Sequence, residues 1–455
     1  MQKDNPHLLL VNPWIHDFAA YDFWAKPMGL LQLAAILRAH DVDVSYIDCL
    51  DRFHPASKTG DLQKRVGRGA YLKTRIPRPA GLKDVPRYFS RYGIPLEWFR
   101  EDLSNTPKPD AVMVTSLMTY WYPGVQETIQ QIREIFPDTP ILLGGIYASL
   151  CGEHAKKHSG ADLVVTGPGE GRVLDLVTEV TGAALTCGFD SQDLDTYPYP
   201  AFELQHWIPY VPILTSRGCP FACTYCASRY LNPRRMRRSP EGVLEEIQYW
   251  HRAHGVVDFA FYDDALLVNA ENHIVPILEG IVAAGLHARF HTPNALHVRE
   301  VTPMVAGLMH ASGFESIRLG VETAAFEERG HLDKKISRGE FLRCIRVLRE
   351  AGFKKKQIGA YILVGLPGQS TSDVVDTIQT VKSAGALPIM AYYTPIPHTA
   401  LWEEALASSR YDLALDPIFT NNAVLPCQKE PFSWEMLKRL KNLILADKRA
   451  AGNIS

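Results

Sequence analysis

Three cysteines in one short stretch carry the most specific chemistry in this sequence. Cys219, Cys223 and Cys226 follow one another with the spacing C-x3-C-x2-C. A [4Fe-4S] cluster normally takes four cysteine ligands, so three thiolates in one tight loop can hold such a cluster and leave one iron without a protein ligand. Catalytic metal sites keep an open coordination position, whereas structural metal sites are fully coordinated by the protein. The spacing therefore predicts an unsaturated [4Fe-4S] site.

A structural zinc site and three ordinary buried cysteines are the other interpretations of this stretch. Structural zinc takes four ligands, usually from paired C-x-x-C motifs or from sets of cysteine and histidine. The sequence has no second C-x-x-C, and its other cysteines stand singly at positions 49, 151, 187, 344 and 427. The ligand count and the spacing thus favour the cluster.

The elements around the cysteines should place them at the carboxyl end of a strand. Residues 211–215 form a short apolar run, which predicts a buried strand. Gly218 and Pro220 flank the first cysteine, and both residue types favour a tight turn. Because active sites in α/β folds lie just beyond the carboxyl ends of strands, the cysteine loop is expected at such an end.

Six strand–helix units follow one another between about residues 201 and 400. Ser239 followed by Pro240 marks the start of the first helix. The strands are expected at 211–215, 257–262, 288–292, 316–320, 357–364 and 387–393, and the helices at 240–250, 271–284, 302–312, 340–351 and 373–383. This series predicts a partial, open (β/α)6 barrel, with all strand ends on one face because the crossovers are right-handed.

The first 200 residues predict a doubly wound parallel sheet of the Rossmann-like type, because short apolar strands alternate with helical segments. Strands are expected at 7–11, 42–47, 111–116, 141–143 and 161–166, and helices at 27–40 and 123–136. Ligands bind such sheets outside the carboxyl ends of the strands. The residues at this edge are Asn12, Pro13, Thr115, Ser116, Gly144, Gly145 and the stretch from Gly167 to Glu170.

Three segments are therefore expected: a Rossmann-like domain over 1–200, a barrel domain over 201–400 and a helical extension over 401–455. A chain of 455 residues is too long for one ordinary core. Residues 50–109 interrupt the alternating pattern, and so long an insertion is usually functional or flexible. It is expected to cover the ligand edge as a lid or to remain a solvated loop. The extension, helical over 433–448, is expected to pack across the barrel mouth.

The cysteine spacing, with Tyr225 directly before the third cysteine, closely resembles the radical S-adenosylmethionine (SAM) superfamily. The resemblance implies that SAM chelates the open iron through its amino and carboxylate groups. It also implies that the reduced cluster cleaves SAM to a 5′-deoxyadenosyl radical. An external electron donor such as flavodoxin or ferredoxin would then be required.

The strand ends of the predicted barrel offer groups that fit SAM. By the resemblance, the carboxylates of Asp263 and Asp264 suit its amino group, and Glu322 matches the family's ribose-contacting position. Gly365 and Gly368 expose backbone to the adenine edge. Each residue alone can equally cap a loop or form a turn. Their position together on the face formed by the strand ends is what favours a SAM site. The full set of candidates is Asp263, Asp264, Asn294, Glu322, Gly365, Pro367 and Gly368.

The first domain looks like the cobalamin-binding domain that precedes many radical SAM domains. The matching features are Asn12-Pro13, the helix start Pro27-Met-Gly-Leu30, Thr115-Ser116, Leu143-Gly-Gly145 and Gly167-Pro-Gly-Glu170. Many cobalamin proteins supply a histidine to the cobalt from D-x-H-x-x-G, which this sequence lacks, since His16-Asp17 has the wrong order and spacing. The resemblance implies cobalamin without that histidine, or a domain that has lost the cofactor and only packs or binds substrate.

Two further groups of residues can be read in two ways each. A basic run can meet a phosphate or carboxylate, since guanidinium groups suit both, or can form a solvated face. The aromatic residues at 120–122 can cover a flat cofactor or pack between the domains. The basic run consists of Arg229, Arg234, Arg235, Arg237 and Arg238.

The bulk properties exclude several classes of protein. A formal net charge of −2 gives no global electrostatic reason to expect nucleic acid as a partner. No apolar run reaches transmembrane length, and the polar start of the chain does not resemble a signal peptide. The scattered cysteines form no disulfide framework, so we expect a cytoplasmic protein in a reducing setting.

Together these features predict a radical SAM enzyme that methylates an unactivated carbon with the help of cobalamin. A radical SAM enzyme that rearranges, couples or closes rings without methyl transfer is an alternative, as is a non-catalytic iron–sulfur or zinc carrier. No feature distinguishes a lipid, a peptide, a tetrapyrrole or a small metabolite as the substrate.

Overall fold

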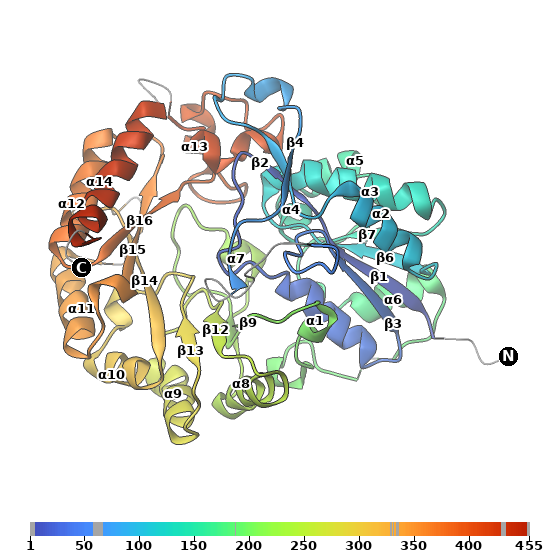
Figure 1. Cartoon of the computed structure of the whole chain (residues 1–455), viewed down its shortest axis with the longest axis horizontal. Coiled ribbons are helices and arrows are strands. Elements are labelled where there is room, and N and C mark those ends of the chain that lie inside the picture. The colour runs from blue at the N-terminus through green and yellow to red at the C-terminus, as the bar shows by residue number, and fades with distance from the viewer. Residues whose placement is uncertain are drawn as a thin grey trace.

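A computed structural model of the chain describes residues 5–57, 67–186, 188–327, 330, 332–333, 336–428 and 434–452. Two parallel sheets organise its two halves, the N-terminal sheet on the right of Figure 1 and the C-terminal sheet on the left. The predicted α/β class, a doubly wound sheet followed by a partial barrel, is confirmed. Cys187 lies outside the described residues.

The N-terminal sheet contains five parallel strands in the order β3-β1-β6-β7-β8. This order reverses between β1 and β6, which is the switch point where ligands bind in doubly wound folds. The strands are β1 (His7–Asn12), β3 (Asp43–Asp48), β6 (Ala111–Val114), β7 (Ile141–Leu143) and β8 (Leu163–Val164).

Helices bury both faces of this sheet. In β1, Leu8 and Leu10 pack on one side with α1 and α6, while Leu9 and Val11 pack on the other with α2 and α3. A continuous apolar strand is what burial on two faces requires. The helices are α1 (Met28–Arg38), α2 (Leu96–Asn105), α3 (Tyr122–Ile135), α4 (Ile146–Leu150), α5 (Gly152–His158) and α6 (Val173–Thr181).

The insertion at 50–109 is folded in its described part, and the solvated-loop alternative is wrong there. Its strands β4 (Lys73–Arg75) and β5 (Ser90–Tyr92) form an antiparallel sheet with β2 (Ile15–Asp17). It then ends in α2, the crossover helix that leads to β6. Because β2 follows the end of β1, the small sheet packs beside the ligand edge.

The C-terminal half is an open barrel of six parallel strands in the order β9-β12-β13-β14-β15-β16, as predicted. The strands are β9 (Val211–Ile213), β12 (Asp258–Phe261), β13 (Arg289–His291), β14 (Phe314–Glu322), β15 (Ile358–Val364) and β16 (Leu387–Tyr392). The outer helices are α8 (Pro240–His254), α9 (Ile274–Ala283), α10 (Pro303–Ala311), α11 (Arg338–Glu350) and α12 (Thr371–Ser383).

Capping residues fix where most of these helices begin. The side chains of Ser239, Thr302, Ser337 and Ser370 each accept a hydrogen bond from a backbone N–H in the first turn of the helix that follows. Such caps satisfy N–H groups that have no partner within the helix. The start of each helix, and so the end of each preceding loop, is therefore set by local sequence.

The last helix lies along the outside of the barrel rather than across its mouth. Within α14 (Trp434–Gly452), Leu437 and Leu440 join the core of the barrel, and the ammonium of Lys382 on α12 donates to the Leu443 carbonyl at 2.7 Å. Figure 1 shows α14 beside α12. The expectation that the tail covers the mouth is thus wrong for this helix.

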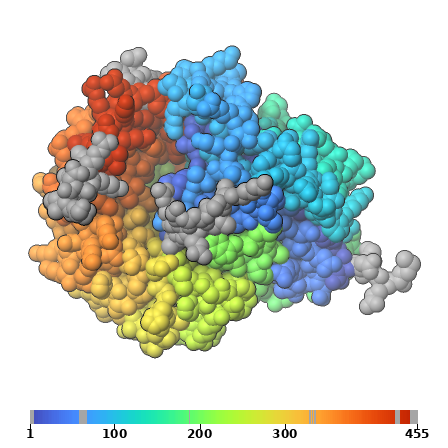
Figure 2. Space-filling view, viewed as in Figure 1, coloured from blue at the N-terminus to red at the C-terminus, as the bar shows by residue number. Residues whose placement is uncertain are grey.

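The segment before α14 returns to the N-terminal half instead. After α13 (Trp402–Ser408), the Tyr411 hydroxyl donates to Asp84 of the insertion at 2.9 Å. Figure 2 shows the red C-terminal surface directly beside the blue surface of the insertion. Within the described residues, no helix combines the length and apolar character needed to cross a membrane.

Candidate active site: a cysteine loop beside an apolar pocket

A two-stranded antiparallel ladder frames the cysteine loop. The strands β10 (Ser216–Arg217) and β11 (Met236–Arg237) pair at the two ends of the loop. Between them, Gly218 has a φ of +79°, and a Cβ at this position would lie 2.8 Å from the carbonyl oxygen of Arg234. The turn into the first cysteine therefore requires glycine.

Backbone contacts hold the middle of the loop in place. Thr224 donates its N–H and its hydroxyl to the Leu332 carbonyl at 2.9 and 3.1 Å, and its own carbonyl accepts from the Leu401 N–H at 2.9 Å. After the third cysteine, the Ser228 N–H lies 3.4 Å from the sulfur of Cys226. The loop is thus fixed between the barrel and the extension.

The three loop cysteines are more accessible than the core cysteines. Cys219 and Cys223 are partly exposed and Cys226 is exposed, whereas the cysteines at 49, 344 and 427 are buried. This contradicts the interpretation of the loop cysteines as ordinary core residues. None of the described cysteines is in a disulfide.

The geometry of the loop differs from that of a site for one metal ion. In the described residues, no group of three or more His, Cys, Asp or Glu side chains converges closely enough to hold a single ion. A [4Fe-4S] cluster binds each thiolate to a different iron, so its ligands lie farther apart than those of one ion. Three accessible thiols on one anchored loop fit the cluster.

Glu322 stands in a strained conformation at the end of β14. Its φ is +63°, which is rare for a residue other than glycine, and the β14–β15 register shifts between Gly320 and Glu322. The side chain is only 6% exposed. Backbone strain of this kind clusters at functional sites.

Glu322 also lies near the cysteine loop. Burial raises the pKa of the Tyr225 hydroxyl well above its usual range, and the next contributions come from the nearby charges of Glu322 and Cys223. The charges of Glu322 and Cys223 thus both act on the Tyr225 hydroxyl, which places Glu322 near the cysteine loop.

The two aspartates after β12 have different surroundings. Asp263 is 3% exposed, and its carboxylate accepts from the hydroxyls of Thr215 at 2.7 Å and Ser216 at 2.6 Å. Burial raises the pKa of Asp263, and these hydrogen bonds oppose the rise. Asp264 is exposed and accepts a hydrogen bond from the Ser228 hydroxyl just after the cysteines. Asp263 thus fastens the strand before the loop, and Asp264 is the one with an accessible face.

The remaining barrel candidates lie in turns at the same strand ends. The Asn294 amide donates to the Tyr262 carbonyl at 2.6 Å. Gly365 has a φ of +95° and its N–H donates to the side chain of Gln369 at 2.8 Å, while Gly368 has a φ of +67°. Pro367 stands between these glycines. The turn interpretation therefore accounts for the two glycines on its own, and an adenine contact is compatible with it.

An apolar pocket of about 320 Å³ opens at the carboxyl edge of the N-terminal sheet. Its walls are the ends of β6, β7 and β8, the helices α1 and α6, and the glycine-rich loop after β8. The predicted residues that line it are Thr115, Gly144, Gly145, Gly167 and Glu170, and the lining residues that the sequence did not indicate include Arg217, Leu231 and Asn232.

Two neighbouring glycines have separate tasks in this pocket. A Cβ at Gly144 would meet nothing within 4 Å, so the missing side chain leaves space in the pocket. Gly145 has a φ of +95°, and a Cβ there would lie 2.3 Å from the carbonyl oxygen of Ser116. The Ser116 hydroxyl donates to the Gly144 carbonyl at 2.6 Å and does not line the pocket. Ser116 therefore supports the turn rather than the ligand.

Asn12 and Pro13 lie outside this pocket, at the edge beside β3. The Asn12 amide donates to Asp48 at 2.7 Å, while its buried oxygen has no hydrogen-bond partner among the described residues. A buried acceptor without a partner is costly, and a ligand with N–H or O–H groups would satisfy it. Pro13 is buried directly after it.

No histidine lines the pocket in the described part of the chain. His16, the nearest candidate in the sequence, is buried, and its Nε2 lies 2.7 Å from a carboxylate oxygen of Glu127. The pocket and its glycine cradle therefore fit part of a large cofactor such as cobalamin, without an imidazole from the expected motif.

The aromatic residues at 120–122 pack between segments and do not line the pocket. Trp121 donates its indole N–H to Asp17 at 2.7 Å, and the Tyr122 hydroxyl donates to Asp416 at 3.0 Å. Tyr120 is 2% exposed. The packing alternative therefore accounts for these residues.

Much of the basic run is bound within the protein. Arg235 and Arg237 both donate to the Val268 carbonyl, at 3.2 and 2.8 Å, and Arg234 donates to Gln192 at 2.7 Å. Arg238 forms a buried ion pair with Glu246. The solvated-face interpretation holds for Arg229, which is exposed.

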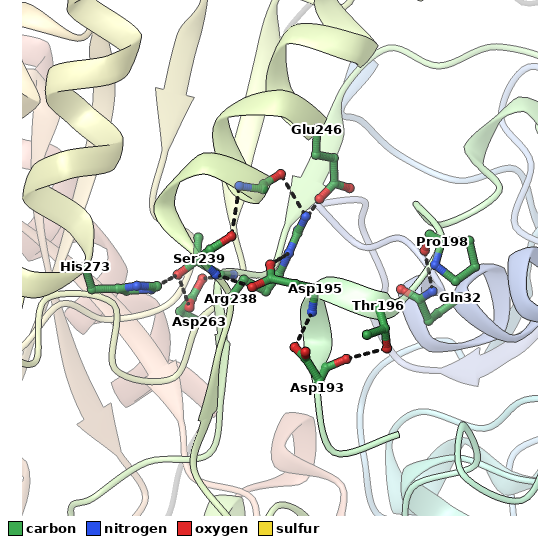
Figure 3. A network of polar contacts seen from close by, with 12 residues as sticks. Gln32, Asp193, Asp195, Thr196, Pro198, Arg238, Ser239, Glu246, Asp263 and His273 are labelled. Carbon is green, nitrogen blue, oxygen red and sulfur yellow. Dashed lines mark hydrogen bonds and ion pairs between the residues drawn. The ribbon is translucent and has the colours of Figure 1, made fainter. Parts of the chain in front are cut away.

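Arg238 belongs to a polar network that ties the linker between the two halves to the barrel (Figure 3). Asp195 of the linker accepts from the Ser239 N–H at 2.7 Å at the start of α8. Gln32 on α1 donates to the Pro198 carbonyl at 2.7 Å, which ties the same linker to the N-terminal half. The network fixes the strand before the cysteines relative to the sheet.

Two family models match the chain. The model of the radical SAM superfamily matches residues 213–381, and the model of the B12 binding domain matches residues 96–177. The first therefore covers the cysteine loop and most of the barrel, and the second begins at α2 and covers most of the pocket wall.

Several curated proteins are similar to this chain in sequence. An uncharacterized methyltransferase of Pyrococcus horikoshii is 24% identical over 66% of this chain and 70% of its own length. The anaerobic magnesium-protoporphyrin IX monomethyl ester cyclase of Rubrivivax gelatinosus is 26% identical over 66% of this chain, which spans 59% of that relative. The cytidylyl-2-hydroxyethylphosphonate methyltransferase of Streptomyces wedmorensis is 21% identical over 83% of this chain and 77% of its own length.

Solved structures share the fold of both halves. The radical SAM methyltransferase TsrM from Kitasatospora setae, solved with cobalamin and a [4Fe-4S] cluster, superposes with a TM-score of 0.65 at 18% identity over 90% of this chain and 79% of its own. The cobalamin-dependent radical enzyme OxsB superposes with a TM-score of 0.56 at 12% identity over 85% of this chain and 53% of its own.

The cofactors follow from the two domains. A radical SAM domain implies a [4Fe-4S] cluster and SAM, and the B12 binding domain together with the likeness to TsrM supports cobalamin. The residues described above fit these groups. The chain therefore carries a radical SAM domain with a B12-binding domain ahead of it.

Proposed function

We propose that this protein is a cobalamin-dependent radical SAM methyltransferase that methylates an unactivated carbon of its substrate. One observation carries the proposal: Arg217, before the three cysteines, and Leu231, after them, both line the apolar pocket of the B12-binding domain. The two cofactor sites thus share a wall. When bound, the cluster and SAM supply radical chemistry, and cobalamin supplies the methyl group.

The residues of the chain have distinct tasks in this proposal. Cys219, Cys223 and Cys226 hold the cluster, and Glu322 accepts hydrogen bonds from the ribose of SAM. Asp264 offers an exposed carboxylate next to the loop for the amino group. These groups lie at the strand ends of one barrel face, and in this proposal they bind and orient SAM there.

The turns at Asn294 and at 365–368 complete the proposed SAM site. Both follow strands that neighbour β14 in the barrel. In this proposal the adenine ring meets backbone groups of these turns other than the Gly365 N–H, which donates to Gln369. The side chain of Asn294 is occupied with the Tyr262 carbonyl.

The apolar walls of the pocket keep water from the ligand of the first domain. The glycines at 144, 145 and 167 line the pocket without side chains, so the backbone can approach a large flat ligand closely. Thr115 lines the same wall. Asn12 offers its unpartnered buried oxygen at the same edge of the sheet. Water exclusion protects a reactive site from quenching.

The electron that the reaction consumes must come from outside the chain. We propose a one-electron donor protein such as flavodoxin or ferredoxin. Because every described cysteine is outside a disulfide, we also propose that the protein works in the reducing cytoplasm.

Anaerobic reconstitution tests the proposal. The protein loaded with iron and sulfide should release 5′-deoxyadenosine from SAM under dithionite, and it should retain cobalamin through gel filtration. Cys219→Ala, Cys223→Ala and Cys226→Ala should each abolish the cluster absorbance and the nucleoside, while Cys151→Ala, a partly exposed cysteine elsewhere, should keep both.

Two results would contradict different parts of the proposal. Release of 5′-deoxyadenosine without retained cobalamin would exclude the methyl-transfer chemistry and leave a radical SAM enzyme of another type. A cluster that survives any of the three loop substitutions with SAM cleavage intact would exclude the proposed cluster ligands.

A further inference from the structure

An ion pair between Glu170 and Arg217 joins the two halves of the protein. The guanidinium and the carboxylate are 2.5 Å apart, and their side chains are 14% and 9% exposed. Glu170 lies in the glycine-rich loop after β8, and Arg217 lies in β10, two residues before Cys219. The pair thus connects the B12-binding domain to the first turn of the cysteine loop.

This pair is also the charged part of the pocket wall. Among the described residues that line the pocket, Glu170 and Arg217 are the only ones with charged side chains. The ring of Tyr197 lies 5.5 Å from the guanidinium carbon of Arg217. Burial raises the pKa of Tyr197 to about 12, and the nearby Glu170 adds to the rise, so the phenol is neutral. A ligand in the pocket therefore meets one paired charge in an otherwise uncharged wall.

The far end of the cysteine loop reaches the same wall. Leu231 and Asn232, at the end of α7 (Ser228–Leu231), line the pocket. A Cβ at Gly218 would lie 3.1 Å from the carbonyl oxygen of Asn232, so the chain before and after the cysteines runs too close together to admit a side chain at this position. Both ends of the segment that carries the three cysteines are therefore set against the pocket.

We propose that the Glu170–Arg217 pair couples the two cofactor sites, so that cobalamin in the pocket tightens SAM binding at the cysteine loop and SAM tightens cobalamin binding. This inference rests on the proposed function. A ligand in the pocket packs against Arg217, Leu231 and Asn232 and restrains both ends of the loop. The loop then has less conformational freedom to lose when SAM orders it. Glu170 acts through Arg217 and is a positioning residue.

Equilibrium dialysis of the cluster-loaded protein under anaerobic conditions tests the coupling. The Kd of hydroxocobalamin is measured with and without SAM, and the Kd of SAM with and without hydroxocobalamin. The coupling factor is the ratio of the Kd of one cofactor without the other to its Kd with the other. Wild-type protein should give the same factor for both cofactors, in the range of about 5 to 150 that is typical of linked sites. Equality of the two factors is a thermodynamic requirement and checks the data.

Variants of Glu170 and Arg217 should reduce the coupling factor between cobalamin and SAM. Glu170→Gln keeps the shape but removes the charge that holds Arg217. The factor should therefore fall several-fold towards 1, while SAM binding without cobalamin stays near the wild-type value. Arg217→Lys retains the charge and should restore part of the factor relative to Arg217→Met. The electron paramagnetic resonance spectrum of the reduced cluster with SAM should change on adding cobalamin in wild type and not in Glu170→Gln.

Glu246→Gln is the matched control. It breaks the Arg238–Glu246 pair, whose side chains are 11% and 1% exposed and which does not line the pocket. This variant should lower Tm and keep the coupling factor. If it abolishes the factor as well, the effect reflects general stability and the inference is wrong.

The remaining outcomes separate this inference from the proposed function. A wild-type factor of 1, or an unchanged factor in Glu170→Gln, overturns the coupling while the proposed function stands. Wild-type protein that retains no cobalamin, or releases no 5′-deoxyadenosine, overturns the proposed function itself.

Discussion

Asp263 accepts hydrogen bonds from both the backbone N–H and the hydroxyl of Thr215, at 3.1 and 2.7 Å. The last register pair of these strands is Phe261 with Ile213, so the contact continues the attachment of β9 to β12 beyond the ladder. Both Asp263 and Thr215 are buried. The strand that enters the cysteine loop is thus fixed by a side chain from its neighbour.

Replacing Asp263 by Asn should loosen this attachment. The amide would set an N–H donor against the hydroxyl donors of Thr215 and Ser216, and a buried donor without a partner costs about 1–3 kcal/mol. We expect chemical denaturation to show a loss of about 2 kcal/mol, together with less iron per protein after reconstitution. Asp264→Asn, at an exposed neighbour, should change stability by less than about 0.5 kcal/mol. Equal stability of both variants would show that Asp263 does not hold the strand.

The lowered pKa of His273 should make the free energy of unfolding depend on pH. Burial, followed by the charges of Arg237 and Arg235, lowers the pKa of His273 to about 4. Its Nε2–H donates to the Thr215 hydroxyl at 2.7 Å, since that hydroxyl itself donates to Asp263. The folded state therefore keeps this imidazole neutral where the unfolded chain would protonate it.

Between pH 6.5 and pH 4 the unfolded state thus binds more protons at this residue, so stability should fall as the pH falls across this window. Across this window, His273 should lower the free energy of unfolding by about 3 kcal/mol in total. His273→Gln keeps an N–H donor for Thr215 but does not titrate. Denaturation curves between pH 4 and pH 7 should show a shallower pH slope for this variant, and parallel slopes would contradict the assignment.

Gly144 and Gly145 should separate ligand binding from folding. Gly144→Leu places its Cβ where no atom lies within 4 Å, and the rest of the side chain should occupy the pocket that Gly144 lines. We expect it to weaken cobalamin binding tenfold or more, at least about 1.4 kcal/mol, without lowering Tm. Gly145→Ala forces a Cβ to 2.3 Å from the Ser116 carbonyl at a φ of +95°, and should destabilise the fold by more than about 1 kcal/mol. Dialysis and thermal unfolding distinguish the two effects. A Gly144→Leu protein that binds cobalamin normally would place the cofactor elsewhere.

Glu322→Gln should weaken SAM binding and leave the fold in place. A hydrogen bond to a charged group contributes about 1.5–3 kcal/mol, so the Kd of SAM should rise by about 10- to 100-fold. Glu340→Gln serves as a control, because Glu340 belongs to the capping box of α11 and pairs with Arg299 at 3.0 Å, and neither contact belongs to the proposed SAM site. An unchanged Kd in Glu322→Gln would remove Glu322 from the proposed SAM site.

The sequence predicted the elements that local patterns define. The bounds of the barrel strands and helices in the structure lie within a few residues of those expected from the sequence. Signals such as Ser239-Pro240 act locally, so they mark where a helix begins. The three cysteines were found for the same reason, since their spacing lies within eight residues of the chain. Helix α2 and the strands of the insertion were missed, because their charged and proline-rich composition hides the helix and strand periods.

Contacts between distant segments could not be predicted. The partner of Glu170 is Arg217, and no local feature of either residue indicates the other. Asp263 has the sequence context of a ligand-binding carboxylate, but its oxygens are used by Thr215 and Ser216. Whether a carboxylate serves a strand or a ligand depends on which neighbours the fold supplies.

The return of residues 416–424 to the N-terminal half has a consequence for synthesis of the protein. Asn421 donates to Asp17 at 2.8 Å, the hydroxyls of Thr420 and Thr119 lie 2.8 Å apart, and Ile418 and Val424 complete the core above the first sheet. At roughly 5–20 residues per second, the ribosome delivers this segment on the order of tens of seconds after Asp17. A truncated gene that ends after the barrel would therefore encode a product whose N-terminal core lacks its last apolar side chains, and expressing the two halves from separate genes would leave the first half open to chaperones and proteases.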